Sequence, residues 1–450
     1  MLENIASLNI PLPEDVQKAK NFGDFDKANR LIDLYLNDEF TAACMKQRLI
    51  TEKEVLRRLP LAYPYDEESA LKLIQEEIPD FTMEELHHYE DIKGADWIYI
   101  NGQVHLQDRF FASLQKVYPE VEARCHTHSE KNTLLLDNMK EMKEKGQASY
   151  HMTVKAGIKI ADKAFVPGKK VLVHLPIPTE CASISNVEIL DHTDLPCHIA
   201  DKNSLSRTIS FETVLEENRD FFVKYSYDCT AKYTALDYNA PSSIDSNETV
   251  EEMAPQIVFT PYIKKLCAEL SEGIEDPLHK ARAFYKYCTE NVTYAFMREY
   301  MTLGNICEYA AAQRIGDCGV KALLFITLCR CAGIPAHWQS GLYVTPDFIG
   351  NHDWSMFKIE PYGWLYADPS FGGSAFRNKE FERQEFYFGN LDPFRMVANN
   401  ELQQEFDPPK KQWRRDPYDN QSGEIEYEDR GLIHDEVETE MVILSAEKIF

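Results

Sequence analysis

A cysteine, a histidine and an aspartate occur in this chain in an order that suits thiol chemistry. Cys318 follows directly on Gly316-Asp317, His352 opens an alternating run, and Asp368 stands before Pro369. A cysteine nucleophile needs a base to take its proton, and the imidazole that does so needs an acceptor that fixes its tautomer and orientation. The chain therefore offers one residue for each of these three roles.

The residues around Cys318 place it on the first turn of a predicted helix. Asp317 can cap a helix that begins at Cys318, and apolar residues recur along one face until Gly333 and Pro335 end it. A helix N-terminus stabilises a thiolate, so we expect the pKa of this thiol to be lowered. The competing interpretation is a buried structural thiol, which is the commoner state of a single cysteine.

The residues after this helix predict an antiparallel hairpin that carries the other two groups. His352 to Ile359 alternate, a turn follows at Pro361-Tyr-Gly363, and the chain returns to Asp368. His352 and Asp368 are therefore expected toward the same end of the hairpin. Because successive side chains alternate across a strand, we expect Asp353 to face away from His352 and to be structural.

In order and spacing these motifs resemble the transglutaminase-like superfamily over residues 280–372. The resemblance implies a papain-like core, in which a nucleophile helix packs against an antiparallel sheet. It also implies that Cys318 is the nucleophile, His352 the base and Asp368 the orienting acid. The motifs that carry it are Gly316-Asp317-Cys318, Arg330-Cys-Ala-Gly-Ile-Pro335, His352-Asp-Trp354 and Gly363-Trp-Leu-Tyr-Ala-Asp368-Pro369.

Acyl transfer also requires hydrogen-bond donors that stabilise the oxyanion of the tetrahedral intermediate. The backbone N–H of Cys318 is one expected donor. Candidates for a second donor are Gln313, Asn305 and Tyr294, and the sequence does not decide among them. Gln313 precedes a helix, where a glutamine is more often polar surface.

The chain as a whole is predicted to be a multidomain α+β protein. Its 450 residues, 44% hydrophobic and 27% charged, are typical of a globular chain with more than one core. We expect a papain-like transglutaminase core preceded by a β-sandwich and a helical region. The predicted divisions are a helical N-terminal region at 1–147 with a β-hairpin near 97–106, a β-sandwich at 148–236, a linker at 237–255, the catalytic core at 256–375, and an acidic C-terminal segment at 376–450 that packs on the core. Within the last segment, residues 424–427 are expected to form an edge strand whose acidic face is solvated.

Charge and cysteine usage narrow the partners that the chain can have. Lys and Arg number 48 against 74 Asp and Glu, for a formal charge of -26, which disfavours nucleic acid and anionic membranes and favours cationic substrates. The beginning of the chain lacks a signal-peptide pattern, so we expect a cytoplasmic protein. The eleven cysteines include no Cys-x-x-Cys pair. A metal set built from Cys318, Cys329, Cys331, His337 and His352 is disfavoured because Cys329 and Cys331 lie one or more helical turns from Cys318 and partly on the apolar face. We expect no metal and no cofactor.

Three functions remain open at this stage. The favoured one is hydrolysis of peptide or side-chain amides, as in a protease or amidase, because water needs no second binding site. A lysine-type amine as acceptor would instead make the protein a transglutaminase. The third alternative is a non-catalytic binding module. The presence of all three candidate residues is evidence against it, although catalysis needs more than these residues. A peptide or protein substrate is expected in the first two cases, and the sequence does not indicate an oligomeric state.

Overall fold

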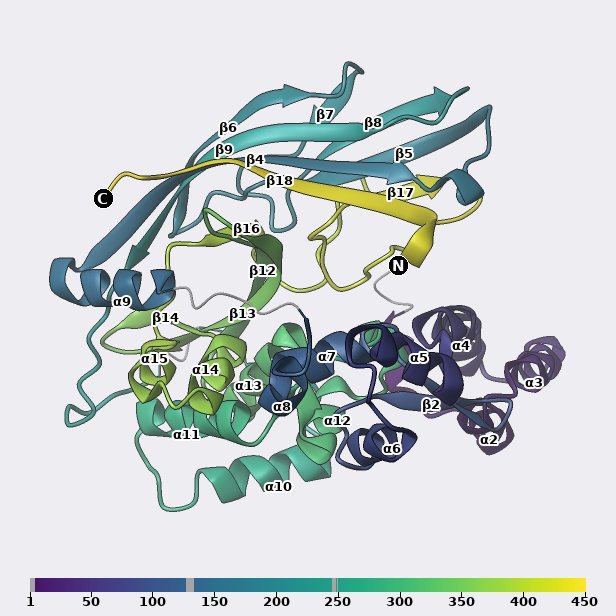
Figure 1. Cartoon of the computed structure of the whole chain (residues 1–450), viewed down its shortest axis with the longest axis horizontal. Helices are drawn as coiled ribbons and strands as arrows, with labels where there is room; N and C mark the ends of the chain where they lie inside the picture. The colour runs from purple at the N-terminus through teal and green to yellow at the C-terminus, as the bar shows by residue number, and fades with distance from the viewer. Residues whose placement is uncertain (1–4, 127–132, 245–247, 249) are drawn as a thin grey trace.

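A computed structural model describes residues 5–126, 133–244, 248 and 250–450. The chain is a mixture of helices and antiparallel sheets, as the predicted α+β class requires. Figure 1 shows long sheet strands at the top, a second sheet with its helices below them, and N-terminal helices at the right. No helix in the described part is both long and apolar enough to cross a lipid bilayer.

The N-terminal region consists of short helices around two small hydrophobic cores and a three-stranded sheet. The predicted hairpin is present, with its turn at Asn101 and Gly102, whose φ angles of 50° and 77° are those that a two-residue turn requires. The elements are η1 (Ser7–Asn9), α2 (Glu14–Phe22), α3 (Phe25–Asn37), α4 (Ala43–Ala62), β1 (Tyr65–Asp66), α5 (Glu67–Glu77), α6 (Met83–Asp91), β2 (Trp97–Ile100), β3 (Gln103–Leu106), α7 (Phe110–Val117) and α8 (Pro119–Glu122).

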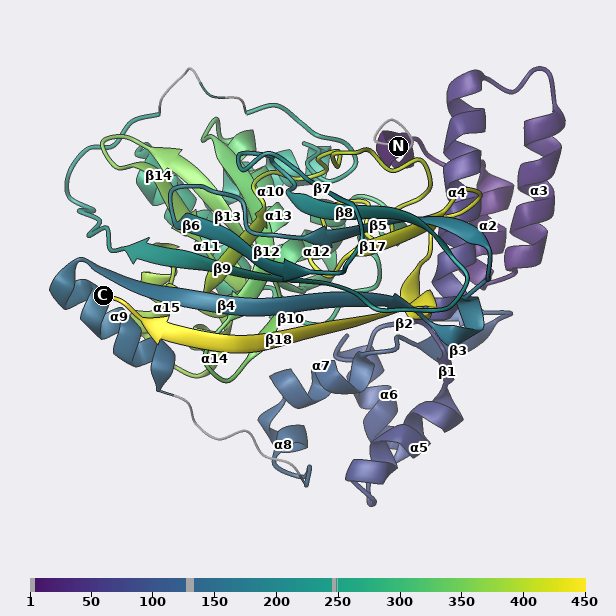
Figure 2. The same ribbon diagram turned by 90° about the horizontal axis from the view of Figure 1, so that it is seen from above.

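A β-sandwich of two four-stranded sheets follows, as predicted. Its strand orders are β17-β5-β8-β7 and β18-β4-β9-β6, all antiparallel, and inward-facing Val, Ile, Phe and Tyr side chains fill the space between them. Figure 2 shows these long strands from above, lying across the core. The elements are α9 (Leu134–Lys145), β4 (Gln147–Ile160), η2 (Asp162–Ala164), β5 (Lys169–Pro176), β6 (Ile184–His192), β7 (Cys197–Ile199), β8 (Thr208–Leu215) and β9 (Phe221–Lys232).

The remaining helices and one five-stranded antiparallel sheet, in the order β15-β14-β13-β12-β16, form the core. Helix α13 lies on this sheet through contacts with β13 and β12. The elements are α10 (Pro261–Leu270), α11 (Pro277–Glu290), β10 (Thr293–Tyr294), η3 (Tyr300–Thr302), α12 (Ile306–Gln313), β11 (Ile315–Gly316), α13 (Cys318–Cys331), β12 (Ala336–Val344), β13 (Ile349–Ile359), β14 (Gly363–Ala367), α14 (Pro369–Arg377), α15 (Phe381–Phe386), β15 (Phe388–Gly389) and β16 (Arg395–Asn399).

The C-terminal stretch 376–450 contributes strands to both sheet systems. β15 and β16 are the two edges of the core sheet, whereas β17 (Glu424–Tyr427), η4 (His434–Glu436) and β18 (Val437–Lys448) continue into the sandwich. β17 pairs with β5 and β18 pairs with β4 along most of its length. The stretch expected to pack on the core therefore also completes both sheets of the sandwich.

The prediction that β17 has a solvated acidic face is wrong. Glu424 and Glu426 are both buried. Lys410 pairs with Glu424 at 2.8 Å, and the backbone N–H groups of Lys411 and Gln412 donate to the Glu426 carboxylate. A buried carboxylate is tolerated only when it is paired, and these partners come from a loop that precedes β17 in the chain.

Candidate active site

Cys318 begins α13, as the sequence predicted. The Asp317 carboxylate accepts a hydrogen bond from the backbone N–H of Val320 at 3.1 Å and caps the helix. Every residue of α13 from Gly319 to Arg330 is buried, whereas the Cys318 side chain is partly exposed. The helix is thus fixed in the core, and its first residue reaches a pocket of about 690 Å³.

His352 and Asp368 meet where the β13–β14 hairpin ends, also as predicted. Nε2 of His352 lies 2.7 Å from Oδ2 of Asp368, and both side chains are buried. The other oxygen of Asp368 accepts hydrogen bonds from the backbone N–H groups of Ser370 and Phe371, because Asp368 also caps α14. This arrangement leaves Nδ1 as the imidazole nitrogen that Asp368 does not use.

Arg395 in β16 is a third member of this group that sequence reasoning missed. Its guanidinium bridges Asp368 at 2.9 Å and Asp392 at 2.8 Å, and it lies over the ring of Phe371 at 4.4 Å. Burial opposes ionisation of Asp368, but the charges of His352 and Arg395 outweigh it and lower the pKa of Asp368 to about 2. The carboxylate is therefore held in its charged form.

Burial disfavours the charged form of the His352 imidazole. It lowers the pKa of His352 below the ordinary value, and the positive charge of Arg395 adds to this effect, whereas Asp368 opposes it. The net direction is downward, so the neutral imidazole predominates near neutral pH. A neutral imidazole is the form that can accept a proton from a thiol.

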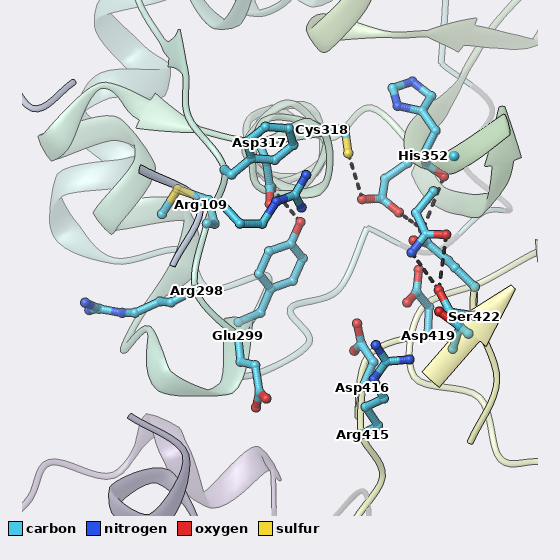
Figure 3. A pocket seen from close by; sticks show the side chains of 18 of the residues that line it. Arg109, Arg298, Glu299, Asp317, Cys318, His352, Arg415, Asp416, Asp419 and Ser422 are labelled. Carbon is cyan, nitrogen blue, oxygen red and sulfur yellow. Dashed lines mark hydrogen bonds between the residues drawn. The ribbon is translucent and has the colours of Figure 1, made fainter. Parts of the chain in front are cut away.

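The thiol of Cys318 donates its hydrogen bond to Asp353, not to His352. Sγ lies 3.2 Å from Oδ2 of Asp353, and no hydrogen bond joins Cys318 and His352 in the described structure. Figure 3 shows Cys318 and His352 in the pocket, without a dashed line between them. Asp353, which we expected to face away from His352 and to be structural, is therefore the residue in contact with the thiol.

Asp353 contacts Cys318 because its face of β13 is the one that packs on helix α13. Phe357, on the same face as Asp353, packs edge-on against Phe325 of α13 with ring centres 5.5 Å apart. A Cβ atom at Gly319 would lie 2.7 Å from Oδ2 of Asp353, so the two elements approach closely at this point. Strand alternation separates Asp353 from His352 but does not reveal which of the two faces carries the helix.

The expectation of a low thiol pKa is also wrong for this arrangement. Enclosure of the sulfur, followed by the negative charges of Asp353 and Asp317, raises the pKa of Cys318 well above the ordinary value of a thiol. These effects outweigh the partial positive charge at the start of α13. The thiol is therefore protonated while it contacts Asp353.

A loop before β17 brings further polar groups to the pocket. Nε2 of Gln421 donates to Oδ1 of Asp353, and Asp419 is buried beside Asp353 while Asp416 is exposed. Burial and the neighbouring Asp419 raise the pKa of Asp353 well above its usual range. The loop residues Asp416, Asp419 and Gln421 lie outside the motifs that the sequence reveals, because this loop reaches the pocket only through the folded chain.

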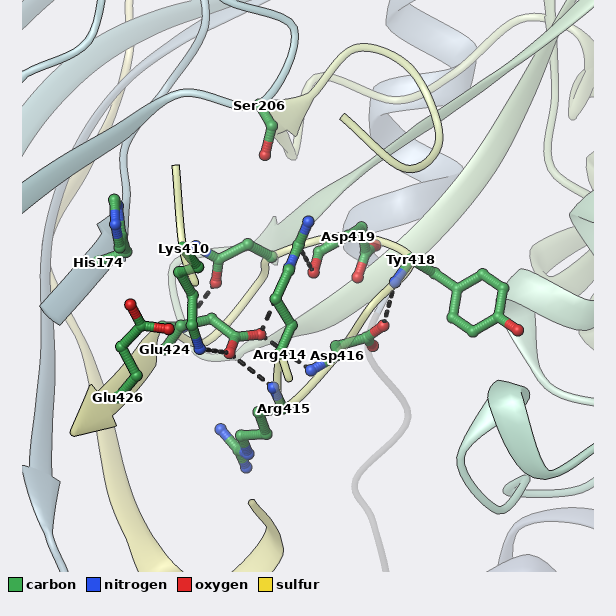
Figure 4. A network of polar contacts seen from close by, with 12 residues as sticks. His174, Ser206, Lys410, Arg414, Arg415, Asp416, Tyr418, Asp419, Glu424 and Glu426 are labelled. Carbon is green, nitrogen blue, oxygen red and sulfur yellow. Dashed lines mark hydrogen bonds and ion pairs between the residues drawn. The ribbon is translucent and has the colours of Figure 1, made fainter. Parts of the chain in front are cut away.

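Buried ion pairs hold this loop in place. Glu424 accepts hydrogen bonds from Nζ of Lys410 and from the backbone N–H groups of Arg415 and Asp416, at 2.8, 2.6 and 2.9 Å respectively. The network in Figure 4 shows Glu424 among these partners, with Asp416 and Asp419 farther along the same loop. The loop that contacts Asp353 is thus tied to β17 by a buried carboxylate.

Of the oxyanion candidates, only Tyr294 lines the pocket. Its strand β10 pairs with β11, so that Tyr294 lies opposite Gly316, two residues before Cys318. Asn305 caps α12 instead, accepting from the N–H of Glu308, and Gln313 lies at the far end of that helix. Of the three side chains considered, Tyr294 is thus the one that lines the same pocket as Cys318 and interacts electrostatically with it.

The five residues considered as a metal set do not gather at this site. Cys329 is buried inside α13, and His337 contacts Glu401 on the core sheet. Among the described residues, the ligand atoms that come within metal-binding reach of one another are those of Glu67, His87 and Glu90 in the N-terminal region. Nothing in that group contacts the pocket.

Residues 264–369 match the family model of the transglutaminase-like superfamily. This stretch forms a transglutaminase-like core. The match includes Cys318, His352 and Asp368, and it confirms the resemblance that the motifs indicate. A search of curated proteins returned no match for the chain.

Several solved structures resemble the chain at low identity. A candidate cysteine protease from Cytophaga hutchinsonii has 14% identity and a TM-score of 0.40, covering 68% of this chain and 91% of its own. The periplasmic domain of TgpA from Pseudomonas aeruginosa has 13% identity and a TM-score of 0.27, covering 55% of this chain and 95% of its own. A candidate protease from Parabacteroides distasonis has 11% identity and a TM-score of 0.21, with 49% and 63% covered.

Proposed function

We propose that the transglutaminase-like core is a thiol acyl-transfer site that hydrolyses peptide or side-chain amides. The observation that supports this most directly is the 2.7 Å contact between Nε2 of His352 and Asp368. It leaves Nδ1 of His352 available to the pocket into which Cys318 opens. In this proposal Cys318 is the nucleophile, His352 the base and Asp368 the group that orients the imidazole.

The first half of the reaction forms a thioester. The sulfur leaves Asp353, its proton passes to Nδ1 of His352, and the thiolate attacks the carbonyl carbon of the amide. The backbone N–H of Cys318 and the hydroxyl of Tyr294 donate to the oxyanion. The C–N bond then breaks, and the imidazolium gives its proton to the departing amine.

The second half releases the acyl group. Water enters, His352 takes a proton from it, and the hydroxide attacks the thioester carbonyl. The C–S bond breaks, the proton returns to sulfur, and a carboxylic acid leaves. Substrate and water are the only reactants, so no cofactor enters this scheme.

Transamidation is a second candidate, favoured by the carboxyl groups of Asp353, Asp416 and Asp419 in the pocket. A lysine-type amine is attracted by such groups and could replace water as the acceptor. Turnover of a peptide library with an added primary amine separates the two reactions. Free acid as the main product supports hydrolysis, whereas incorporation of the amine supports transamidation.

A labelling experiment tests whether the site is catalytic at all. The chain is treated with a thiol-directed electrophile and each cysteine is quantified by peptide mapping. The surface-exposed Cys44 serves as the internal reference, because it lies outside the pocket. Modification of Cys318 that slows in His352→Ala, while the rate at Cys44 stays the same, supports the proposal. A Cys318 rate that is equal in the wild type and in His352→Ala would favour a non-catalytic binding module.

A further inference from the structure

Two cations of the N-terminal region line the pocket without forming an ion pair within the described residues. Arg109 directly precedes α7 and Lys116 lies in its last turn, and both side chains are exposed. No ion pair or side-chain hydrogen bond to an acid is formed by either one among the described residues. Charged groups that line a pocket without a partner are candidates for contact with a ligand of opposite charge.

Aromatic rings hold both cations in place. The guanidinium carbon of Arg109 lies 3.4 Å from the centre of the Phe296 ring, and Nζ of Lys116 lies 4.1 Å from the centre of the Tyr294 ring. Tyr294 and Phe296 themselves pack edge to face at 5.4 Å. A stacked guanidinium keeps its in-plane N–H groups free, so Arg109 is arranged to donate to a carboxylate without further ordering.

Carboxyl groups lie on both sides of the sulfur, since Asp317 lies on the same side as Arg109 (Figure 3). Figure 3 shows the Arg109 side chain on one side of Cys318 and the carboxyl groups of Asp416 and Asp419 on the other. Asp317 interacts electrostatically with both Arg109 and Lys116 but forms no ion pair with either one in the described structure. An anionic group of a substrate is repelled from Asp416 and Asp419 and attracted to Arg109 and Lys116.

We propose that Arg109 and Lys116 bind a carboxylate of the substrate close to the amide that Cys318 attacks. The inference rests on the proposed function and adds a substrate class to it, namely amides with a nearby free carboxylate. It differs from the cationic preference that the net charge of -26 suggests. The charge of the whole chain does not describe this side of the pocket.

A pair of alkylating reagents tests the inference without knowledge of the natural substrate. Iodoacetate and iodoacetamide form the same C–S bond with loss of iodide, but only iodoacetate carries a carboxylate. The measured quantity is the ratio of their rates at Cys318, obtained by peptide mapping. In Arg109→Gln/Lys116→Gln we expect the iodoacetate-to-iodoacetamide ratio to fall about tenfold, which corresponds to about 1.4 kcal/mol for the two exposed ionic contacts together.

Matched variants separate charge from damage to the fold. Arg109→Lys/Lys116→Arg keeps both charges and should retain most of the wild-type ratio. Lys72→Gln, an exposed lysine on α5 away from the pocket, should leave the ratio unchanged. Added salt should lower the wild-type ratio and have little effect on the double glutamine variant.

The outcomes for this inference and for the proposed function are distinct. If iodoacetamide labels Cys318 rapidly but the ratio is the same in wild type and in the double glutamine variant, the carboxylate site is refuted and the thiol function stands. If the rate of labelling at Cys318 is the same in the wild type and in His352→Ala with both reagents, the proposed function fails and the inference fails with it.

A peptide series then identifies the source of the carboxylate. One pair of peptides differs only in a free or amidated C-terminus, and a second pair has Asp or Asn next to the same amide. Faster turnover of the free C-terminus points to an α-carboxylate, and faster turnover of the Asp peptide points to a side chain. Equal rates within both pairs would contradict the inference.

Discussion

Replacement of Arg395 by methionine tests the polar cluster behind His352. Methionine has a similar length but no charge, so Asp368 and Asp392 both lose the guanidinium that contacts them at 2.9 and 2.8 Å. Each of the three side chains is no more than 2% exposed. Removal of one partner from a buried ion pair typically costs about 3–5 kcal/mol of unfolding free energy, because the charges left behind remain desolvated.

The assay is urea unfolding followed by tryptophan fluorescence, since the Trp354 ring lies 5.4 Å from the Arg395 guanidinium. Arg395→Lys keeps the charge and is expected to lose less stability than the methionine variant. Arg395→Met/Asp392→Asn removes one of the stranded carboxylates and should recover part of the loss. An unfolding midpoint of Arg395→Met equal to that of the wild type would refute the ion-pair cluster.

The pH dependence of the same measurement has a defined sign. The pKa of Asp368 is lowered to about 2 from 3.8, so the folded state favours the carboxylate. This contributes roughly 2–3 kcal/mol of stability above the unfolded-state pKa, and that contribution is lost as the pH falls toward about 2. Because Arg395 is part of the cause, the stability gap between wild type and Arg395→Met should narrow as the pH falls through this window.

Three further predictions concern the residues around the sulfur. In Asp353→Asn the negative charge next to Cys318 is lost, so iodoacetamide alkylation of Cys318 above neutral pH should be faster by about tenfold or more, measured by peptide mapping; an unchanged rate would contradict the contact. In Gly319→Ala the new methyl group meets the Asp353 carboxylate and should lower both stability and alkylation rate, as measured by thermal unfolding and mapping. In Lys410→Met the buried Glu424 loses the nearer of its two cations and keeps Arg414 at 3.8 Å, so the unfolding free energy should fall by about 3 kcal/mol, and a value unchanged from the wild type would refute the pairing.

The local parts of the site could be predicted from the sequence. The capping residue Asp317, the helical repeat after Cys318, and the turn between His352 and Asp368 are all signals within a few residues of the group they position. Such signals depend on backbone geometry and hydrogen bonding along the chain, so they can be recognised without knowledge of the tertiary fold. The helix and the hairpin are both present in the structure.

The parts that could not be predicted depend on contacts between distant segments. Arg395 reaches Asp368 because β16 pairs with β12, and nothing local in the sequence specifies that pairing. Asp353 reaches Cys318 because of the face on which α13 packs, which alternation does not define. The raised pKa of the thiol follows from this contact. The helix terminus alone therefore predicted the wrong direction for the pKa shift.

The burial of the C-terminal strand β17 could not be predicted from the sequence for the same reason. An acidic composition predicts a solvated segment, whereas Lys410 and the backbone N–H groups of its loop make burial of Glu424 and Glu426 possible. Composition reports how many charges a segment has, and it does not report which partners the fold brings to them.

The central claim is that Cys318 forms an acyl-enzyme with the help of His352. Incubation with p-nitrophenyl acetate, followed by acid quench and peptide mapping, tests it directly. We expect an acetyl thioester on Cys318 that forms and then decays as p-nitrophenolate is released. In His352→Ala we expect this acetylation to be lost, while the exposed Cys44 is unaffected. Acetylation that is equal at Cys318 and Cys44, or that persists at Cys318 in His352→Ala at the wild-type rate, would contradict it.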